Sequence, residues 1–253
     1  MKTRRLAVTG LALVATLSFG VAGCNTGTGT SGADGGTSAA PQLTAAEELA
    51  AAAKKLNQDT VAVAMRMTGL KSDGAMDPAG KKAKMTMDIS ANGESMKIEM
   101  VALDTDLYMK MAGAPGLPKT WMRIDATKVK EGSTFDFMPD GDASGANNLV
   151  NSMVTVERDG ERSFKGSMDI TKSRNANQES LKTLGDKAKA IPFTAKVDDQ
   201  GRLIEITVDM KSVLASLGEM KTTYSNFGEP VEVSKPAGSV TDAPQSLLDA
   251  FGV

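Results

Sequence analysis

The spacing of hydrophobic residues changes from a helical to a strand period near the start of the folded region. Thr44 and Glu47 have the spacing of a capping box. The apolar residues that follow lie on one helical stripe: Leu49, Ala52, Ala53 and Leu56. We therefore expect an amphipathic helix over residues 45–58. From Thr60 onward alternate residues are apolar, which is typical of a half-buried strand; these are Val61, Val63, Met65 and Met67.

Residues 85–112 predict a three-stranded meander in which the turns and the hydrophobic pattern agree. Asn92-Gly93 favours a two-residue hairpin loop, and Asp104-Thr105 provides a second tight turn. A one-residue slip in register would move the apolar residues to the other face, so this agreement is informative. The expected pairs are Met85 with Met100, Met87 with Ile98, Ile89 with Met96, Met100 with Met109, Ile98 with Met111, and Ala102 with Leu107. The sequence thus predicts a methionine-rich sheet face.

The rest of the chain predicts further strands and short helices. We expect strands at 120–125 and 220–226, irregular chain over 126–146, and helices at 147–153 and 177–189. One hairpin would pair Val156 with Phe164 and Val154 with Gly166. A turn at Gln200-Gly201 would pair Ile191, Phe193, Ala195 and Val197 with Met210, Val208, Ile206 and Ile204. Nine or more strands and two main helices without β-α-β alternation indicate the α+β class.

The N-terminal residues indicate export and anchoring. Residues 1–23 have a basic start, an apolar run and small residues at the end, as secretory signal peptides do. Val21-Ala22-Gly23-Cys24 resembles the bacterial lipobox, in which the cysteine receives diacylglycerol and, after cleavage, an N-acyl group such as palmitate. More than one acyl chain gives stable anchoring. The Arg4-Arg5 pair leaves both the general secretory and the twin-arginine route open.

These features divide the chain into three parts. We expect a signal peptide at 1–23, the lipidated Cys24 with a flexible tether at 24–42, and a single domain at 43–253. The tether is rich in Gly, Ser and Thr, and the random-coil rule gives its 18 residues from Asn25 to Gln42 a reach of roughly 23 Å. The domain is long enough to bury roughly 70% of its unfolded surface.

Composition excludes several classes of function. The chain has no histidine and one cysteine, so Ser-His and Cys-His catalytic arrangements, histidine metal sites and intrachain disulfides are excluded. Removing residues 1–23 takes three of the 29 basic residues away and leaves the 31 acidic ones, so the exported form carries a charge of about −5. No basic surplus points to nucleic acid.

Methionine is the unusual component, with 16 residues against seven Phe, two Tyr and one Trp. Because methionine is flexible and polarizable, a surface rich in it accommodates varied apolar shapes such as acyl chains. An ordinary hydrophobic core remains the alternative. The candidate lining residues are Val61, Val63, Met65, Met67, Met85, Met87, Ile89, Met96, Ile98, Met100, Leu107, Met109, Met111, Ile204, Ile206 and Val208. A rival reading is copper(I) binding by the Met65/Met67, Met85/Met87 and Met109/Met111 thioether pairs.

Several segments together resemble the exported lipoproteins of the LppX/LprG type, which share the LolA/LolB-like fold. The resemblance rests on the lipobox, the opening helix and strand, residues 106–110 and 121–125, the hairpin at 200–203 and the closing segment 224–231. It implies a strongly curved antiparallel sheet, an incomplete barrel, with helices covering its concave, apolar face. It also implies a cavity that binds acyl chains of lipids or lipoglycans, and it supplies no catalytic residue.

The leading hypothesis is therefore a non-enzymatic lipoprotein of the cell envelope, anchored to the outer face of the cell membrane through Cys24. It would bind or transfer lipids or acylated glycolipids and would need no cofactor. The two alternatives are a copper(I)-binding lipoprotein and a sensor or interaction protein that regulates a membrane partner. A membrane transporter or receptor would be the protein partner, and no nucleic acid is expected.

Overall fold

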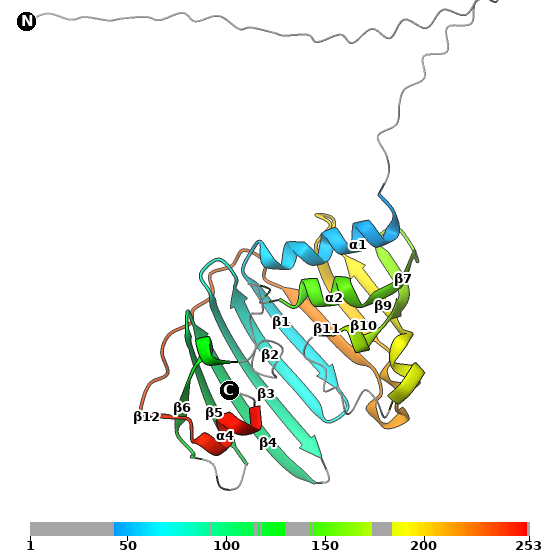
Figure 1. Ribbon diagram of the computed structural model, residues 1–253. Helices are drawn as coiled ribbons and strands as arrows, with labels where there is room; N and C mark the ends of the chain where they lie inside the picture. Colours follow the sequence, from blue (N-terminus) through cyan, green and yellow to red (C-terminus); the bar gives the residue numbers. More distant parts are fainter. Residues whose placement is uncertain are drawn as a thin grey trace, which may run out of the picture. The chain divides into compact units, whose positions relative to one another are not determined.

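Twelve strands form one large sheet in the computed structural model of this protein, and the sheet curves in Figure 1. The structure describes residues 43–91, 93–113, 116, 118–129, 142, 144–173 and 184–251. Across the sheet the strand order is β12-β6-β5-β4-β3-β2-β1-β11-β10-β9-β8-β7. Every neighbouring pair is antiparallel except β12 and β6, which are parallel. Among the described residues the edge strands β12 and β7 do not pair with each other, so the mixed sheet is open.

The strands are β1 Val61–Met67, β2 Leu70–Asp77, β3 Lys82–Ala91, β4 Glu94–Leu103, β5 Asp106–Ala112, β6 Trp121–Asp125, β7 Met153–Arg158, β8 Ser163–Met168, β9 Ile191–Val197, β10 Leu203–Val208, β11 Met220–Ser225 and β12 Val240–Asp242. The helices are α1 Ala45–Lys54, α2 Ala146–Ser152 and α4 Gln245–Phe251. Short 3-10 turns are η1 Lys55–Asn57, η2 Ala126–Lys128, η4 Ile170–Lys172, η5 Gly185–Lys189, η6 Met210–Ser212 and η7 Ala215–Leu217.

The predicted meander is confirmed pair by pair in β3, β4 and β5. Ile89 lies opposite Met96, Met87 opposite Ile98, Met85 opposite Met100, Met100 opposite Met109, Ile98 opposite Met111 and Ala102 opposite Leu107. The same register continues through β2 and β1 on one side and β6 on the other. We call the side that carries these residues the inner face and the opposite side the outer face.

Helix α1 packs on the inner face of one half of the sheet. The predicted capping box is present: the Glu47 backbone N–H donates to Thr44 Oγ1 at 3.3 Å, and the Thr44 N–H donates to Glu47 Oε2 at 2.8 Å. The Thr44 N–H and the Thr44 hydroxyl both donate to the Glu47 carboxylate, and these two bonds lower the pKa of that carboxyl. The α-helix ends at Lys54 and continues as η1, close to the predicted 45–58. Its apolar stripe joins a fully buried cluster with residues of β8, β9 and β10, including Phe164, Ile191, Phe193, Leu203 and Val208.

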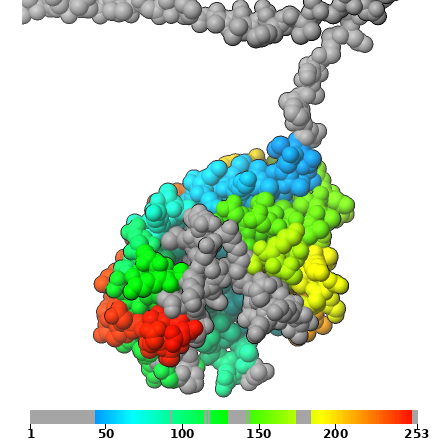
Figure 2. All heavy atoms as spheres, viewed as in Figure 1, coloured from blue at the N-terminus to red at the C-terminus, as the bar shows by residue number. Residues whose placement is uncertain are grey.

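The C-terminal residues contact both faces of the other half. The Lys84 ammonium donates to the Glu232 carbonyl oxygen at 2.9 Å, and the Lys235 ammonium lies 5.9 Å from the centre of the Tyr108 ring on the outer face. After β12 the chain reaches the inner face, where Leu247 of α4 joins a buried cluster with β4, β5 and β6. Figure 2 shows α1 in blue and α4 in red at opposite ends of the viewed side.

One predicted hairpin register is wrong, and a second is correct over only part of its length. In β7–β8, Val156 pairs with Gly166 and Arg158 with Phe164, because the connection is the four residues 159–162 and the Asp159 N–H donates to the Ser163 carbonyl. In β9–β10, Phe193 pairs with Val208 and Ala195 with Ile206 as predicted. A bulge then pairs Val197 with Leu203 in place of Ile204, and Met210 leaves the sheet in η6, so that Ile191 pairs only with Met168 of β8.

The other sequence predictions agree with the structure to different extents. Helix α2 and strands β6 and β11 lie within one residue of their predicted bounds at each end. Strand β2, strand β12 and helix α4 have no counterpart in the sequence predictions. Most of the segments predicted at 126–146 and 177–189 lies outside the described residues; the described end of the latter is the 3-10 turn η5.

Candidate functional site

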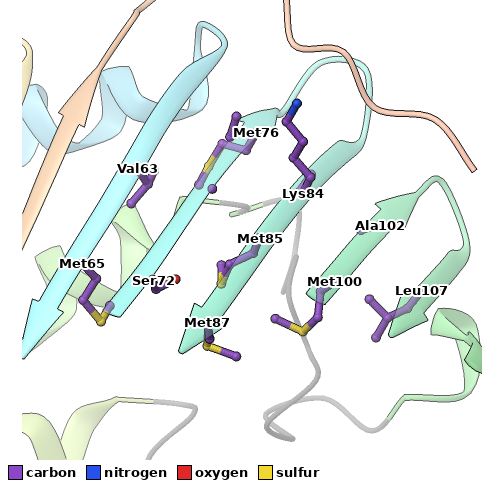
Figure 3. Close-up of a pocket in the computed structure, with 13 residues that line it drawn as sticks. Val63, Met65, Ser72, Met76, Lys84, Met85, Met87, Met100, Ala102 and Leu107 are labelled. Atoms are coloured by element: carbon purple, nitrogen blue, oxygen red, sulfur yellow. The ribbon is translucent and has the colours of Figure 1, made fainter. Parts of the chain in front are cut away.

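A pocket of about 130 Å³ opens on the inner face over strands β1 to β5 (Figure 3). It lies between the buried cluster under α1 and the one under α4, because its residues come from the central strands of the sheet. The lining residues are Val63, Met65, Ser72, Gly74, Ala75, Met76, Ala83, Lys84, Met85, Met87, Met100, Ala102 and Leu107.

Small residues at inner-face positions explain the hollow. On β2, Gly74 lies between Val63 of β1 and Met85 of β3, and Ser72 lies between Met65 and Met87. A Cβ on Gly74 would lie 2.8 Å from the Lys84 carbonyl oxygen, so only glycine allows β2 and β3 to approach this closely. Ala83 and Ala102 are likewise cross-strand partners on β3 and β4. Long side chains thus surround a floor of short ones.

Five methionines provide most of the long side chains of the pocket: Met65, Met76, Met85, Met87 and Met100. Met85 and Met100 are direct cross-strand partners, and the row continues through Met109 to Met122. Met76 and Met100 are buried, whereas Met65, Met85 and Met87 are half-buried. Because unbranched thioether side chains change rotamer easily, the walls can adapt to the shape of an apolar occupant.

The pocket holds no charged group among its described lining atoms. Lys84 is exposed, and its ammonium is hydrogen bonded to the Glu232 carbonyl oxygen on the outer face, away from the pocket. Figure 3 shows the Lys84 side chain leading away from Met85 and Met87. The one other polar side chain in the described lining is Ser72. The site is therefore suited to an uncharged, mainly apolar group.

The structure brings six of the sixteen candidate lining residues into this pocket: Val63, Met65, Met85, Met87, Met100 and Leu107. Ile98, Met109 and Met111 are buried in the cluster under α4, with Ile89 and Met96 half-buried beside it. Val61, Ile206 and Val208 belong to the cluster under α1, and Met67 and Ile204 are half-buried elsewhere on the sheet.

Seven lining residues were not anticipated: Ser72, Gly74, Ala75, Met76, Ala83, Lys84 and Ala102. Four of them lie on β2, a strand that the hydrophobic pattern did not reveal. The available indication was a pair of turns, at Thr68-Gly69 and at Pro78 to Gly80, that bounds a segment of strand length.

A buried polar cluster lies at the end of η1, outside the pocket. Asp142 accepts hydrogen bonds from the Asn57 side-chain amide at 2.7 Å and the Asn147 N–H at 2.8 Å. Burial, together with the negative charge of Asp142, raises the pKa of Tyr224 to about 12. These contacts tie η1 to the start of α2, and the Asp142 carboxylate has the local backbone bonding expected of a turn aspartate.

The residues that the structure describes contain neither a cluster of acidic, histidine or cysteine metal ligands nor a membrane-spanning helix. Across the described residues, no three His, Cys, Asp or Glu side chains lie together as metal ligands would. No helix in the same residues has the length and apolar character needed to span a membrane.

Comparison with known proteins does not indicate a function for this site. No protein-family model matches the sequence, and no curated protein matches it. The pocket on the inner face of β1 to β5 is therefore the feature from which a function must be argued.

Proposed function

We propose that this protein is a membrane-anchored lipoprotein that binds or transfers lipids by enclosing acyl chains against the inner face of its sheet. The observation that carries the proposal is the apolar, methionine-walled pocket over β1 to β5. Residues 1–23 would be removed on export, Cys24 would carry the anchoring acyl groups, and residues 25–42 would be the tether. The protein would work at the outer face of the cell membrane, without a cofactor and without catalysis.

The arrangement of helices supports this reading. Apolar side chains of α1 and α4 pack at two separate places on the inner face, and the pocket lies on the strands between them. In our proposal the sheet is an incomplete barrel whose concave side is the inner face, and the helices cover that side around the acyl chain. A membrane transporter or receptor would then receive or supply the lipid.

Copper(I) binding is the second candidate, because five thioethers line one pocket and two of them are direct cross-strand partners. Soft sulfur ligands are those that copper(I) prefers. Native mass spectrometry of the exported form, followed by organic extraction, separates the candidates. Co-purified lipid supports the first and contradicts the second. Retained copper without lipid does the reverse, and neither ligand would contradict both.

A pocket-filling substitution tests whether the lipid occupies this pocket. Ala83→Leu adds volume to the pocket floor at an inner-face position, and Ala64→Leu makes the same change on the outer face of β1. We expect Ala83→Leu to reduce co-purified lipid several-fold while Ala64→Leu keeps the wild-type amount. Both extracted proteins should unfold within about 4 °C of the wild type, equivalent to roughly 1 kcal/mol. Full lipid occupancy in Ala83→Leu would place the lipid elsewhere.

The anchor has its own test. Cys24→Ser should move the protein from the membrane fraction to the soluble exported fraction, because the thiol that accepts diacylglycerol is gone. Unchanged membrane association would contradict lipidation at Cys24 and would leave the pocket proposal unaffected.

A further inference from the structure

Ser72 is the one uncharged polar side chain among the described lining residues of the pocket. It lies on β2 between two half-buried methionines, Met65 on β1 and Met87 on β3. Only 7% of the Ser72 surface is exposed. Figure 3 shows it among the methionine side chains of the pocket.

The hydroxyl of Ser72 has no hydrogen-bond partner among the residues that the structure describes. The one hydrogen bond made by this residue outside the sheet ladder is to its backbone carbonyl oxygen, which accepts from Arg66 Nη1 at 2.7 Å. Glu48 Oε2 is the one described side-chain atom that is both fully enclosed and without a hydrogen-bond partner, so the unpartnered Ser72 hydroxyl is reached from the pocket. Buried polar side chains of folded proteins are usually satisfied by protein, water or ligand. Since the neighbours of Ser72 are thioethers and aliphatic groups, its hydrogen-bond partner is water or a ligand that displaces that water.

Burial changes along the pocket and gives the occupant a direction. Two inner-face positions beyond Ser72, about 13 Å along the strand, lies Met76, in the buried row with Ala102 and Leu107. In the other direction the inner-face residues are Leu70, Ile89 and Met96, which are only half-buried. An acyl tail is favoured at the buried end, and a polar headgroup at the more open end.

We propose that Ser72 is the polar anchor of the pocket and donates a hydrogen bond to the ester carbonyl at the junction of acyl tail and headgroup. The inference rests on the proposed lipid-binding function and narrows the ligand to acyl esters. The tail extends from Ser72 toward Met76 and Ala102, and the headgroup lies toward Leu70 and Ile89. Ser72 thereby makes the pocket prefer an acyl ester over an alkyl ether of equal length.

The test compares two lipids that differ only at that carbonyl: 1-palmitoyl lysophosphatidylglycerol and its 1-O-hexadecyl ether analogue. Binding to the delipidated full-length protein is measured by displacement of a fluorescent fatty acid, below the concentration at which either lipid forms micelles. Wild type should bind the ester roughly three- to tenfold more tightly, as one hydrogen bond predicts. In Ser72→Ala the ratio should fall to about one, with the affinity for the ether unchanged.

Thr222→Val is the matched control. Thr222 is 6% exposed, lies on the same face two strands away as the partner of Met65, and is not part of the pocket lining. Removal of the Thr222 hydroxyl in this variant should leave the ester preference as in the wild type. If Ser72→Ala keeps the ester preference of the wild type, Ser72 is not the anchor. The same holds if the wild type binds both lipids with equal affinity. Either result would contradict the role of Ser72 and leave the proposed lipid-binding function in place. Binding of neither lipid by wild type would overturn the proposed function itself.

A structural role for Ser72 gives a different result. Because the hydroxyl makes no hydrogen bond to a described protein group, delipidated Ser72→Ala should unfold at the wild-type temperature or above it. A clear fall in that temperature would show that the hydroxyl stabilises the fold and would contradict the anchor.

Discussion

The two halves of the sheet have the same strand geometry, yet one is closed and the other is hollow. On β8, β9 and β10 the inner face carries branched and aromatic residues such as Phe164, Phe193 and Val208, all nearly inaccessible and packed with α1. On β1, β2 and β3 the same face carries methionines beside Ser72 and Gly74. The difference shows that the size and shape of residues at equivalent positions, and not the sheet itself, decide whether an interior is filled.

Helix length explains why only part of the inner face is closed by α1. Ten helical residues extend about 15 Å. Twelve strands spaced about 4.8 Å apart extend about 53 Å across the sheet. Helix α4, with seven residues, is shorter still. Among the described residues, the apolar surface of the central strands therefore exceeds what these helices can pack against.

The largest expected effect comes from a charge placed where the hollow half meets the cluster under α4. Ile98 is buried there, whereas its neighbour Lys97 is exposed on the outer face. Ile98→Asp should cost several kcal/mol and prevent folding, because an unpaired carboxylate is costly to bury. Lys97→Asp places a second carboxylate opposite Asp88 on the outer face, and it should lower the free energy of unfolding by about 1 kcal/mol or less. Circular dichroism and urea unfolding measure both, and equal losses would contradict the assigned faces.

A pair of truncations compares the two halves directly. Phe164→Ala in the closed half should lower the free energy of unfolding by about 3–5 kcal/mol, because it leaves a cavity in a packed core. Met87→Ala in the pocket wall should lower it by only about 1 kcal/mol, because Met87 is half-buried and already borders empty space. Urea unfolding of the delipidated variants provides the measurement. Similar losses would mean that the hollow half is packed as tightly as the closed one.

The smallest effect concerns the two tyrosines of the chain. Tyr224 lies on the inner face beside Val63, where its pKa is about 12, and burial with the Asp106 charge raises the pKa of Tyr108 on the outer face. Because Tyr224 of the unfolded chain ionises near its ordinary value of 10, stability should fall as pH rises from about 10 to 12. Tyr224→Phe should reduce that fall and remove the contribution of Tyr224 to the ultraviolet titration, which leaves that of Tyr108. An unchanged loss of stability between pH 10 and 12 in this variant would contradict the raised pKa of Tyr224.

The meander was predictable because its determinants are local. Two short turns and strict alternation specify the register of β3, β4 and β5 without reference to the rest of the chain. The predicted β7–β8 register was wrong because the four-residue connection 159–162 does not fix the pairing as a two-residue turn does, so side-chain packing decides it. The β9–β10 register was wrong at one end because a bulge near Leu203 buries Leu203 in place of Ile204.

Strand β2 shows why the pocket could not be found from the pattern. Its inner-face positions are Leu70, Ser72, Gly74 and Met76, and the two central ones break the apolar alternation that reveals a strand. The same two residues form the floor of the hollow. The feature that concealed the strand is therefore the feature that makes the site.

The amino-acid sequence by itself determined the local elements: the capping box at Thr44, the alternating strands, the tight turns of the meander and its methionine-rich face. Export and lipidation at Cys24 stay predictions of the sequence alone. Only the tertiary structure decided the strand order, the parallel pairing of β12 with β6 and the placement of α1 and α4 at separate ends of the inner face. These depend on contacts between residues far apart in the chain, whose free energy comes from burial and packing and leaves no periodic trace in the sequence.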